Sequence, residues 1–160
     1  MERSAWMCLG LLVWVSSCCL AAEFDPCPSV NHMVLSNVKR SAGYQTQASD
    51  RPLCDTQLVQ GWYRFQSGAG GEMPNTCPDR LRCGTVAPVW MNGKVPSATD
   101  GITTARACAN FNDTSGPRCC QRSIDILVKN CTGFLVYYLK PTPTCSIAYC
   151  AGDRAPCPAG

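Results

Sequence analysis

Histidine is nearly absent from this sequence, which contains only His32. A Ser-His or Cys-His hydrolase would need that residue, but His32 lies in a loop-like region and the chain has no serine-elbow or free-thiol signature. The acidic residues mostly flank turns or cysteines, where an Asp side chain bonds to nearby backbone, so they offer no clear carboxylate pair for glycoside hydrolysis. We therefore expect no enzymatic activity.

Cys-x-x-Cys pairs are also missing, and the single histidine is far from any paired cysteines. Zinc sites usually draw their ligands from such groups, so we expect no metal ion or other cofactor. The formal net charge is only +3 and the basic residues are scattered along the chain. Nothing therefore favours a nucleic acid as partner.

Only one long apolar stretch occurs, from Ala5 to Leu20, and it ends at the small residues Ala21 and Ala22. This is the pattern of a secretory signal peptide, which we predict over residues 1–22. A signal anchor is the alternative, but the stretch is short for a membrane span. Because the C-terminus lacks the hydrophobic tail of a lipid-anchor signal, we expect a secreted, extracellular product without a membrane span.

Cysteine, in contrast, is abundant, with 14 residues in the chain. Cys8, Cys18 and Cys19 lie in the predicted signal peptide, so eleven remain in the mature protein. In an oxidising compartment this density predicts a disulfide framework. We expect Cys119 and Cys120 to reach separate partners, because neighbouring side chains on a strand point to opposite faces.

Short runs of strand-forming residues alternate with turn signals such as Asn92-Gly93 and Thr132-Gly133. A short helix within residues 102–109 is the alternative to one of the strands. The pattern predicts a small disulfide-rich, mainly β domain of short antiparallel strands with at most one or two short helices. The strands are expected at residues 62–65, 84–90, 103–111, 124–129 and 134–139.

The mature chain divides by composition into three parts. Residues 23–50 resemble a loop in composition and are expected to form an N-terminal arm stapled to the rest by Cys27. Residues 51–150 are expected to form a cysteine-rich module, and residues 151–160 a C-terminal tail with the extra cysteine, Cys157.

Two acceptor sequons for N-linked glycans occur beside predicted turns, Asn112-Asp113-Thr114 and Asn130-Cys131-Thr132. We expect glycans at Asn112 and Asn130. The first sequon lies in a long polar turn and is the better candidate. The second has a cysteine as its middle residue, which can slow modification if a disulfide forms first.

Cysteine motifs and an aromatic strand together point to a known family. They are Gly61-Trp62-Tyr63-Arg64-Phe65, Met73-Pro74-Asn75-Thr76-Cys77, the run from Cys83 to Gly93, Ala107-Cys108-Ala109, Cys119-Cys120, Val128-Lys129-Asn130-Cys131 and the run from Tyr137 to Cys150. Over residues 25–150 the chain resembles the cysteine-rich module of the uromodulin family, shared with the major zymogen-granule membrane glycoprotein.

The resemblance implies the ten-cysteine form of this module, closed by five bridges whose pairing the order of cysteines does not reveal. Cys157 lies past the module, so an unpaired thiol, a bridge between two copies and a truncated product all stay open. The cysteines implied to pair are Cys27, Cys54, Cys77, Cys83, Cys108, Cys119, Cys120, Cys131, Cys145 and Cys150.

The resemblance also implies a glycan decoy for mannose-binding bacterial fimbrial adhesins in innate defence. Here the chain departs from the family, since Lys94, Tyr138 and Lys140 stand where two family sequons need other residues. Asn112 and Asn130 are the remaining candidates to carry that function.

An extracellular protein bound without glycans is the alternative partner. It would use an exposed aromatic patch of Trp62, Tyr63 and Trp90, although aromatic residues in strands more often pack inward.

Overall fold

The computed structural model describes residues 24–113 and 116–153. Within these ranges strands dominate, and the helices are two three-residue 3-10 turns, η1 (Ser29–Asn31) and η2 (Val38–Arg40). The predicted class, a small disulfide-rich and mainly β domain, is confirmed. The signal peptide expected at residues 1–22 and Cys157 lie outside the described residues.

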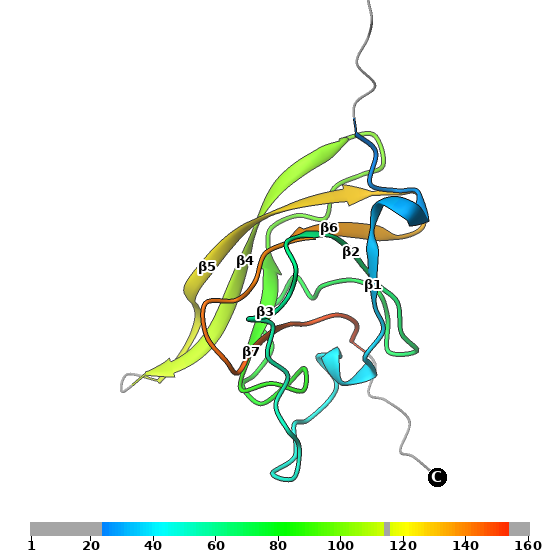
Figure 1. Ribbon diagram of the computed structural model, residues 1–160. Coiled ribbons are helices and arrows are strands. Elements are labelled where there is room, and N and C mark those ends of the chain that lie inside the picture. The colour runs from blue at the N-terminus through cyan, green and yellow to red at the C-terminus, as the bar shows by residue number, and fades with distance from the viewer. Residues whose placement is uncertain (1–23, 114–115, 154–160) are drawn as a thin grey trace, which may run out of the picture.

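In the described part of the chain, seven strands form one curved sheet in the order β1-β2-β6-β5-β4-β3-β7 (Figure 1). All five predicted strands are present, as β2 to β6. The helix considered within residues 102–109 is wrong, because β4 is a continuous strand between β3 and β5. The strands are β1 (Met33–Leu35), β2 (Gly61–Phe65), β3 (Ala87–Asn92), β4 (Ile102–Asp113), β5 (Gly116–Asn130), β6 (Leu135–Leu139) and β7 (Ile147–Tyr149).

The expectation of purely antiparallel pairing is corrected at both edges of the sheet. β1 pairs parallel with β2, and β7 pairs parallel with β3. Both edge strands have only three residues, and long connections rather than tight hairpins bring them beside their partners. A local sequence pattern indicates neither so short a strand nor a parallel partner that lies far away in the chain. The N-terminal arm therefore contributes a strand as well as loop.

The core lies against one face of the sheet, where alternate residues of neighbouring strands meet. Tyr63 pairs with Tyr137, and Tyr137 pairs with Val128, so these three side chains share a face. All three are buried. The hydroxyl of Tyr137 accepts a hydrogen bond from the backbone N–H of Met73 at 3.0 Å, and burial raises the pKa of this phenol well above its usual range.

The β4–β5 hairpin is longer than the strands on either side of it. β3 follows β4 only as far as the Val89–Ala109 pair, and β6 follows β5 only from Leu127 onward. The outer half of the hairpin therefore has no further strand beside it among the described residues, and Figure 1 shows it extending past the rest of the sheet.

Among the described residues, ten cysteines form five disulfides, most of which connect distant parts of the chain. Cys119 and Cys120 go to different partners, and together they anchor the hairpin to itself and to the loop before β3. Cys83 and Cys150 are fully buried. The pairs are Cys27–Cys131, Cys54–Cys145, Cys77–Cys119, Cys83–Cys150 and Cys108–Cys120.

Candidate functional site

The aromatic residues considered as an exposed patch are buried. Trp62, Tyr63 and Trp90 are 8%, 4% and 8% exposed. Tyr63 donates its hydroxyl proton to the carbonyl of Val59 at 2.6 Å, and the indole N–H of Trp90 donates to the carbonyl of Cys119 at 2.7 Å. The patch prediction is wrong, because these residues pack inward, and Tyr63 and Trp90 satisfy their polar atoms internally.

Exposed apolar side chains gather elsewhere, in the N-terminal part of the described chain. Val30 is 89% exposed and Val34 is 52% exposed. β1, which includes Val34, is an edge strand, so one side of its backbone faces away from the sheet. The other large apolar residues exposed in this region are Phe24, Met33 and Val38.

Asn112 lies one residue before the end of β4, where its backbone pairs with Pro117 on the projecting hairpin. Thr114 of its sequon lies outside the described residues. The backbone of Asn112 therefore lies in the part of the hairpin that has no further strand beside it among the described residues.

Asn130 has a very different environment at the end of β5. The side chain is half-buried, and its Nδ2 donates to the carbonyl of Pro96 at 3.0 Å. Its Oδ1 accepts from the backbone N–H of Thr132, also at 3.0 Å. The next residue, Cys131, bridges to Cys27. The structure therefore constrains both ends of this amide and the residue that follows it.

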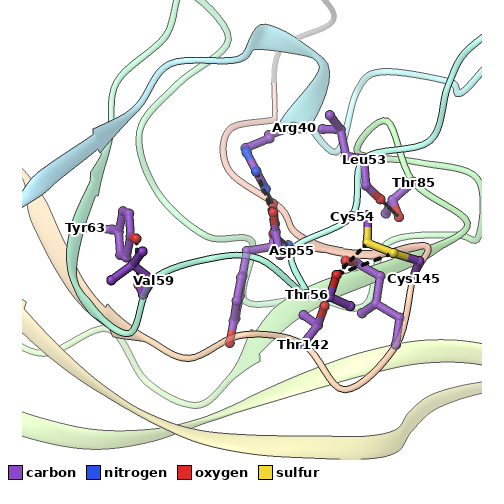
Figure 2. A network of polar contacts seen from close by, with 12 residues as sticks. Arg40, Leu53, Cys54, Asp55, Thr56, Val59, Tyr63, Thr85, Thr142 and Cys145 are labelled. Atoms are coloured by element: carbon purple, nitrogen blue, oxygen red, sulfur yellow. Dashed lines mark hydrogen bonds and ion pairs between the residues drawn. A yellow bond between two sulfur atoms is a disulfide. The ribbon is translucent and has the colours of Figure 1, made fainter.

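A buried ion pair that the sequence pattern did not reveal joins Arg40 and Asp55 (Figure 2). Arg40 Nη1 and Nη2 donate to the two carboxylate oxygens of Asp55 at 2.8 and 2.7 Å. The same groups hold both backbone atoms of Tyr149: its carbonyl accepts from Arg40 and its N–H donates to Asp55. This bidentate arrangement fixes η2, the loop after Cys54 and β7 together.

The sequence does not predict this ion pair, because both residues stand in contexts that are typical of the protein surface. Arg40 follows Lys39 in what reads as a surface pair, and Asp55 follows a cysteine and precedes a turn. Neither residue has a local periodicity that marks burial. Beyond the ion pair itself, the contacts of these two side chains hold the backbone of Tyr149.

The same region contains the Cys54–Cys145 bridge, whose sulfurs both lie near the hydroxyl of Thr56 (Figure 2). Cys145 is exposed and Cys54 is half-buried. Thr142 is buried close by, and its backbone N–H donates to the carbonyl of Asp55. The network in Figure 2 thus continues from a buried ion pair to a bridge at the surface.

His32 is half-buried and lies against a small aromatic and cationic cluster. Its Nδ1 donates to the carbonyl of Pro26 at 2.8 Å, and its ring lies 6.0 Å from that of Phe134. The guanidinium of Arg64 lies over the ring of Phe134, 3.9 Å from the ring centroid. The described part of the chain places no serine or cysteine nucleophile in hydrogen bond with this imidazole.

Other polar features have structural roles or no assigned chemistry. A cleft of about 440 Å³ has Glu72 and Asp153 among its lining residues, together with three glycines. Across residues 24–113 and 116–153, no group of three or more His, Cys, Asp or Glu side chains is placed to hold a metal ion. No helix in the same ranges is long and apolar enough to cross a membrane.

These features define a class: a small β module held together by disulfides, with polar groups used for structure. The model of the uromodulin-like domain family matches residues 63–151. The pancreatic secretory granule membrane major glycoprotein GP2 of Rattus norvegicus is 42% identical over 131 residues, covering 79% of this chain and 23% of that protein. Uromodulin of Mus musculus is 42% identical over 127 residues, covering 79% of this chain and 18% of that protein.

The chain belongs to the uromodulin-like domain family. A relative from Homo sapiens, the pancreatic secretory granule membrane major glycoprotein GP2, is 40% identical over 134 residues, covering 83% of this chain and 23% of that protein. The chain spans about a fifth of the length of the relatives it matches, so the match establishes one module in common. It confirms the resemblance drawn from the cysteine and aromatic motifs.

Proposed function

We propose that this chain is a secreted, non-enzymatic module that displays N-linked glycans to mannose-specific bacterial fimbrial adhesins. The observation that carries the proposal is the position of Asn112 near the end of the projecting β4–β5 hairpin. A glycan there would be separated from the body of the sheet and open to a large bacterial partner.

Two further points support the proposal. The GP2 relatives are named as major glycoproteins. The family resemblance places a glycan at the position of Tyr138, but here the Tyr138 hydroxyl accepts from Gln60 at 3.0 Å and its ring packs on Trp62. Display of a glycan would therefore move from that strand to the hairpin.

The test is capture of the secreted protein on a mannose-specific fimbrial adhesin, before and after enzymatic removal of high-mannose glycans. Asn112→Gln should abolish most capture, and the exposed, non-sequon variant Asn92→Gln should leave it unchanged. Capture that survives both deglycosylation and Asn112→Gln would contradict the proposal.

A glycan-independent protein partner is the second candidate, favoured by the apolar side chains exposed around β1. Val34→Lys would place a charge on this edge and should abolish binding to such a partner, whereas deglycosylation should not affect it. The two candidates thus respond oppositely to the same pair of treatments.

The signal peptide over residues 1–22 and the role of Cys157 belong to the proposal too. N-terminal sequencing of the secreted product should begin after Ala22 or a neighbouring residue. If Cys157 bridges two copies, electrophoresis without reductant should show a dimer that Cys157→Ser removes.

A further inference from the structure

Two reactions act on neighbouring residues during maturation of this chain: glycan transfer to Asn130 and bridge closure at Cys131. As a sequon, Asn130-Cys131-Thr132 must present a free amide to the glycan-transferring enzyme. As part of the fold, Cys131 closes the bridge to Cys27 across 104 residues of sequence. The structure around Asn130 determines whether the first reaction can follow the second.

The folded sequon is held at every position. Asn130 ends the β5–β6 ladder opposite Leu135, and its amide bonds to Pro96 and Thr132. The backbone N–H of Cys131 donates to Phe134 at 2.8 Å, which closes a tight turn. Thr132 itself has a φ of 55°, in the left-handed region. An enzyme that must take Asn and Thr into its own site would have to undo this turn.

The Cys27 segment on the other side of the bridge is also fixed. Lys129 Nζ contacts Asp25 Oδ1 at 2.9 Å, beside the disulfide, and Pro26 is buried. A bridge closing so long a loop removes much of the freedom of the unfolded chain, which stabilises the folded state around the sequon. Local opening of the sequon is therefore opposed by a covalent bond, an ion pair and packing together.

We infer that closure of the Cys27–Cys131 bridge decides whether Asn130 receives a glycan, so that oxidation of this one pair regulates glycan number. The inference rests on the proposed glycan-display function and concerns one of its two acceptors. In glycan transfer, Asn130 Nδ2 forms a bond to the first sugar of a lipid-linked oligosaccharide, the bond from that sugar to the pyrophosphate breaks, and one amide proton is lost. In bridge closure, two thiols lose two protons and two electrons to a thiol oxidant of the secretory compartment.

The test measures the fraction of Asn130 and of Asn112 that carries a glycan, by site-specific mass spectrometry of total cellular protein. Wild-type chains should carry a glycan on Asn130 less often than on Asn112. Cys27→Ser leaves Cys131 without its partner and keeps the sequon intact, so the occupied fraction of Asn130 should at least double. A pulse of mild reductant during synthesis of the wild-type chain should raise it in the same direction.

Cys54→Ser is the matched control, since it breaks a bridge of similar span, 91 residues, away from the sequon. It should leave Asn130 at the wild-type level, and Asn112 should be unaffected by either variant. Full occupancy of Asn130 in the wild type, no rise in Cys27→Ser, or an equal rise in Cys54→Ser would overturn the inference. Occupancy is read without any adhesin, so a failed capture experiment leaves this test independent.

Discussion

At the scale of single residues, Arg40 and Asp55 form a buried ion pair. Both side chains are more than nine-tenths buried, so each charge has lost most of its hydration. That cost is offset because the two groups meet bidentately and share the backbone of Tyr149. Removing either partner would leave the other as an unpaired charge inside the protein.

Asp55→Asn should lower the free energy of unfolding by about 3–5 kcal/mol, the usual cost of breaking a buried ion pair from one side. Urea denaturation of the oxidised protein measures it. Asp125→Asn is the control, since Asp125 is 72% exposed and lies 4.0 Å from Arg106. That variant should change stability by less than about 1 kcal/mol, and equal effects of the two variants would contradict the assigned role of Asp55.

Asp50 makes the stability of the fold depend on acidity. The ammonium of Lys39 at 2.6 Å, followed by the backbone of Gln47 and the hydroxyl of Tyr44, lowers the pKa of Asp50 to about 2. A carboxyl whose pKa falls on folding stabilises the protein above its unfolded value of 3.8, and this stabilisation is lost as the pH falls toward about 2.

Wild-type protein should therefore lose stability more steeply than Asp50→Asn across this acidic window. Urea midpoints measured at a series of pH values give the comparison. If the urea midpoints of the two proteins changed with pH in parallel, the acid-dependent loss of stability would not come from Asp50.

At the scale of elements, the segment after β7 passes two other segments of the same chain so closely that only glycine fits. Gly152 has a φ of 86°, and a Cβ there would collide with the carbonyl of Ala69. Its own backbone donates to Glu72 and accepts from Ala42, at 2.7 and 2.9 Å. This crossing connects the arm, the loop after β2 and the end of β7.

Gly152→Ala should destabilise the protein by about 1–3 kcal/mol, because it adds backbone strain and a collision that backbone atoms cannot easily relieve. Thermal unfolding followed by circular dichroism provides the measurement. Gly93→Ala, where a Cβ would meet nothing, should stay within about 0.5 kcal/mol of wild type. A tolerated Gly152→Ala would mean that the crossing is looser than described.

At the scale of the whole molecule, a large share of the stability comes from the five bridges of the described residues, which span between 12 and 104 residues. Each native bridge of a small secreted domain contributes about 2–5 kcal/mol, comparable with the total stability of many such domains. Full reduction should therefore greatly lower the melting temperature, and an unchanged melting curve would contradict a disulfide-dependent fold.

Partial reduction should open the bridges in order of access, because a thiolate must reach a sulfur to exchange with it. Cys145 and Cys119 are exposed, whereas Cys83 and Cys150 are both fully buried. Alkylation followed by mass spectrometry should label Cys145 and Cys119 first and the Cys83–Cys150 pair last. Early labelling of Cys83 would show that the protein opens globally before any single bridge is reduced.

Much of the fold could be predicted because its signals are local. Alternation of apolar and polar residues, with turn residues between, located the central strands, and Gly61 to Phe65 was visible from its aromatic run. β1 and β7 were missed, since three residues are too few for a pattern and their parallel partners lie far away in the chain.

The candidate site was only partly predictable. The sequons are defined by three consecutive residues, so Asn112 and Asn130 could be named directly. That their surroundings differ, one on a projecting hairpin and one bonded to Pro96, depends on contacts with remote segments. The burial of Trp62 and Trp90 likewise depends on what covers them.

The sequence by itself determined the family, the mainly β class and the ten cysteines available for bridging, since composition, short motifs and alternation are properties of neighbouring residues. Only the tertiary structure decided the disulfide pairing, the Arg40–Asp55 ion pair and the restraint on Asn130. Each of these joins residues distant in the chain, and their meeting depends on how the whole sheet is assembled.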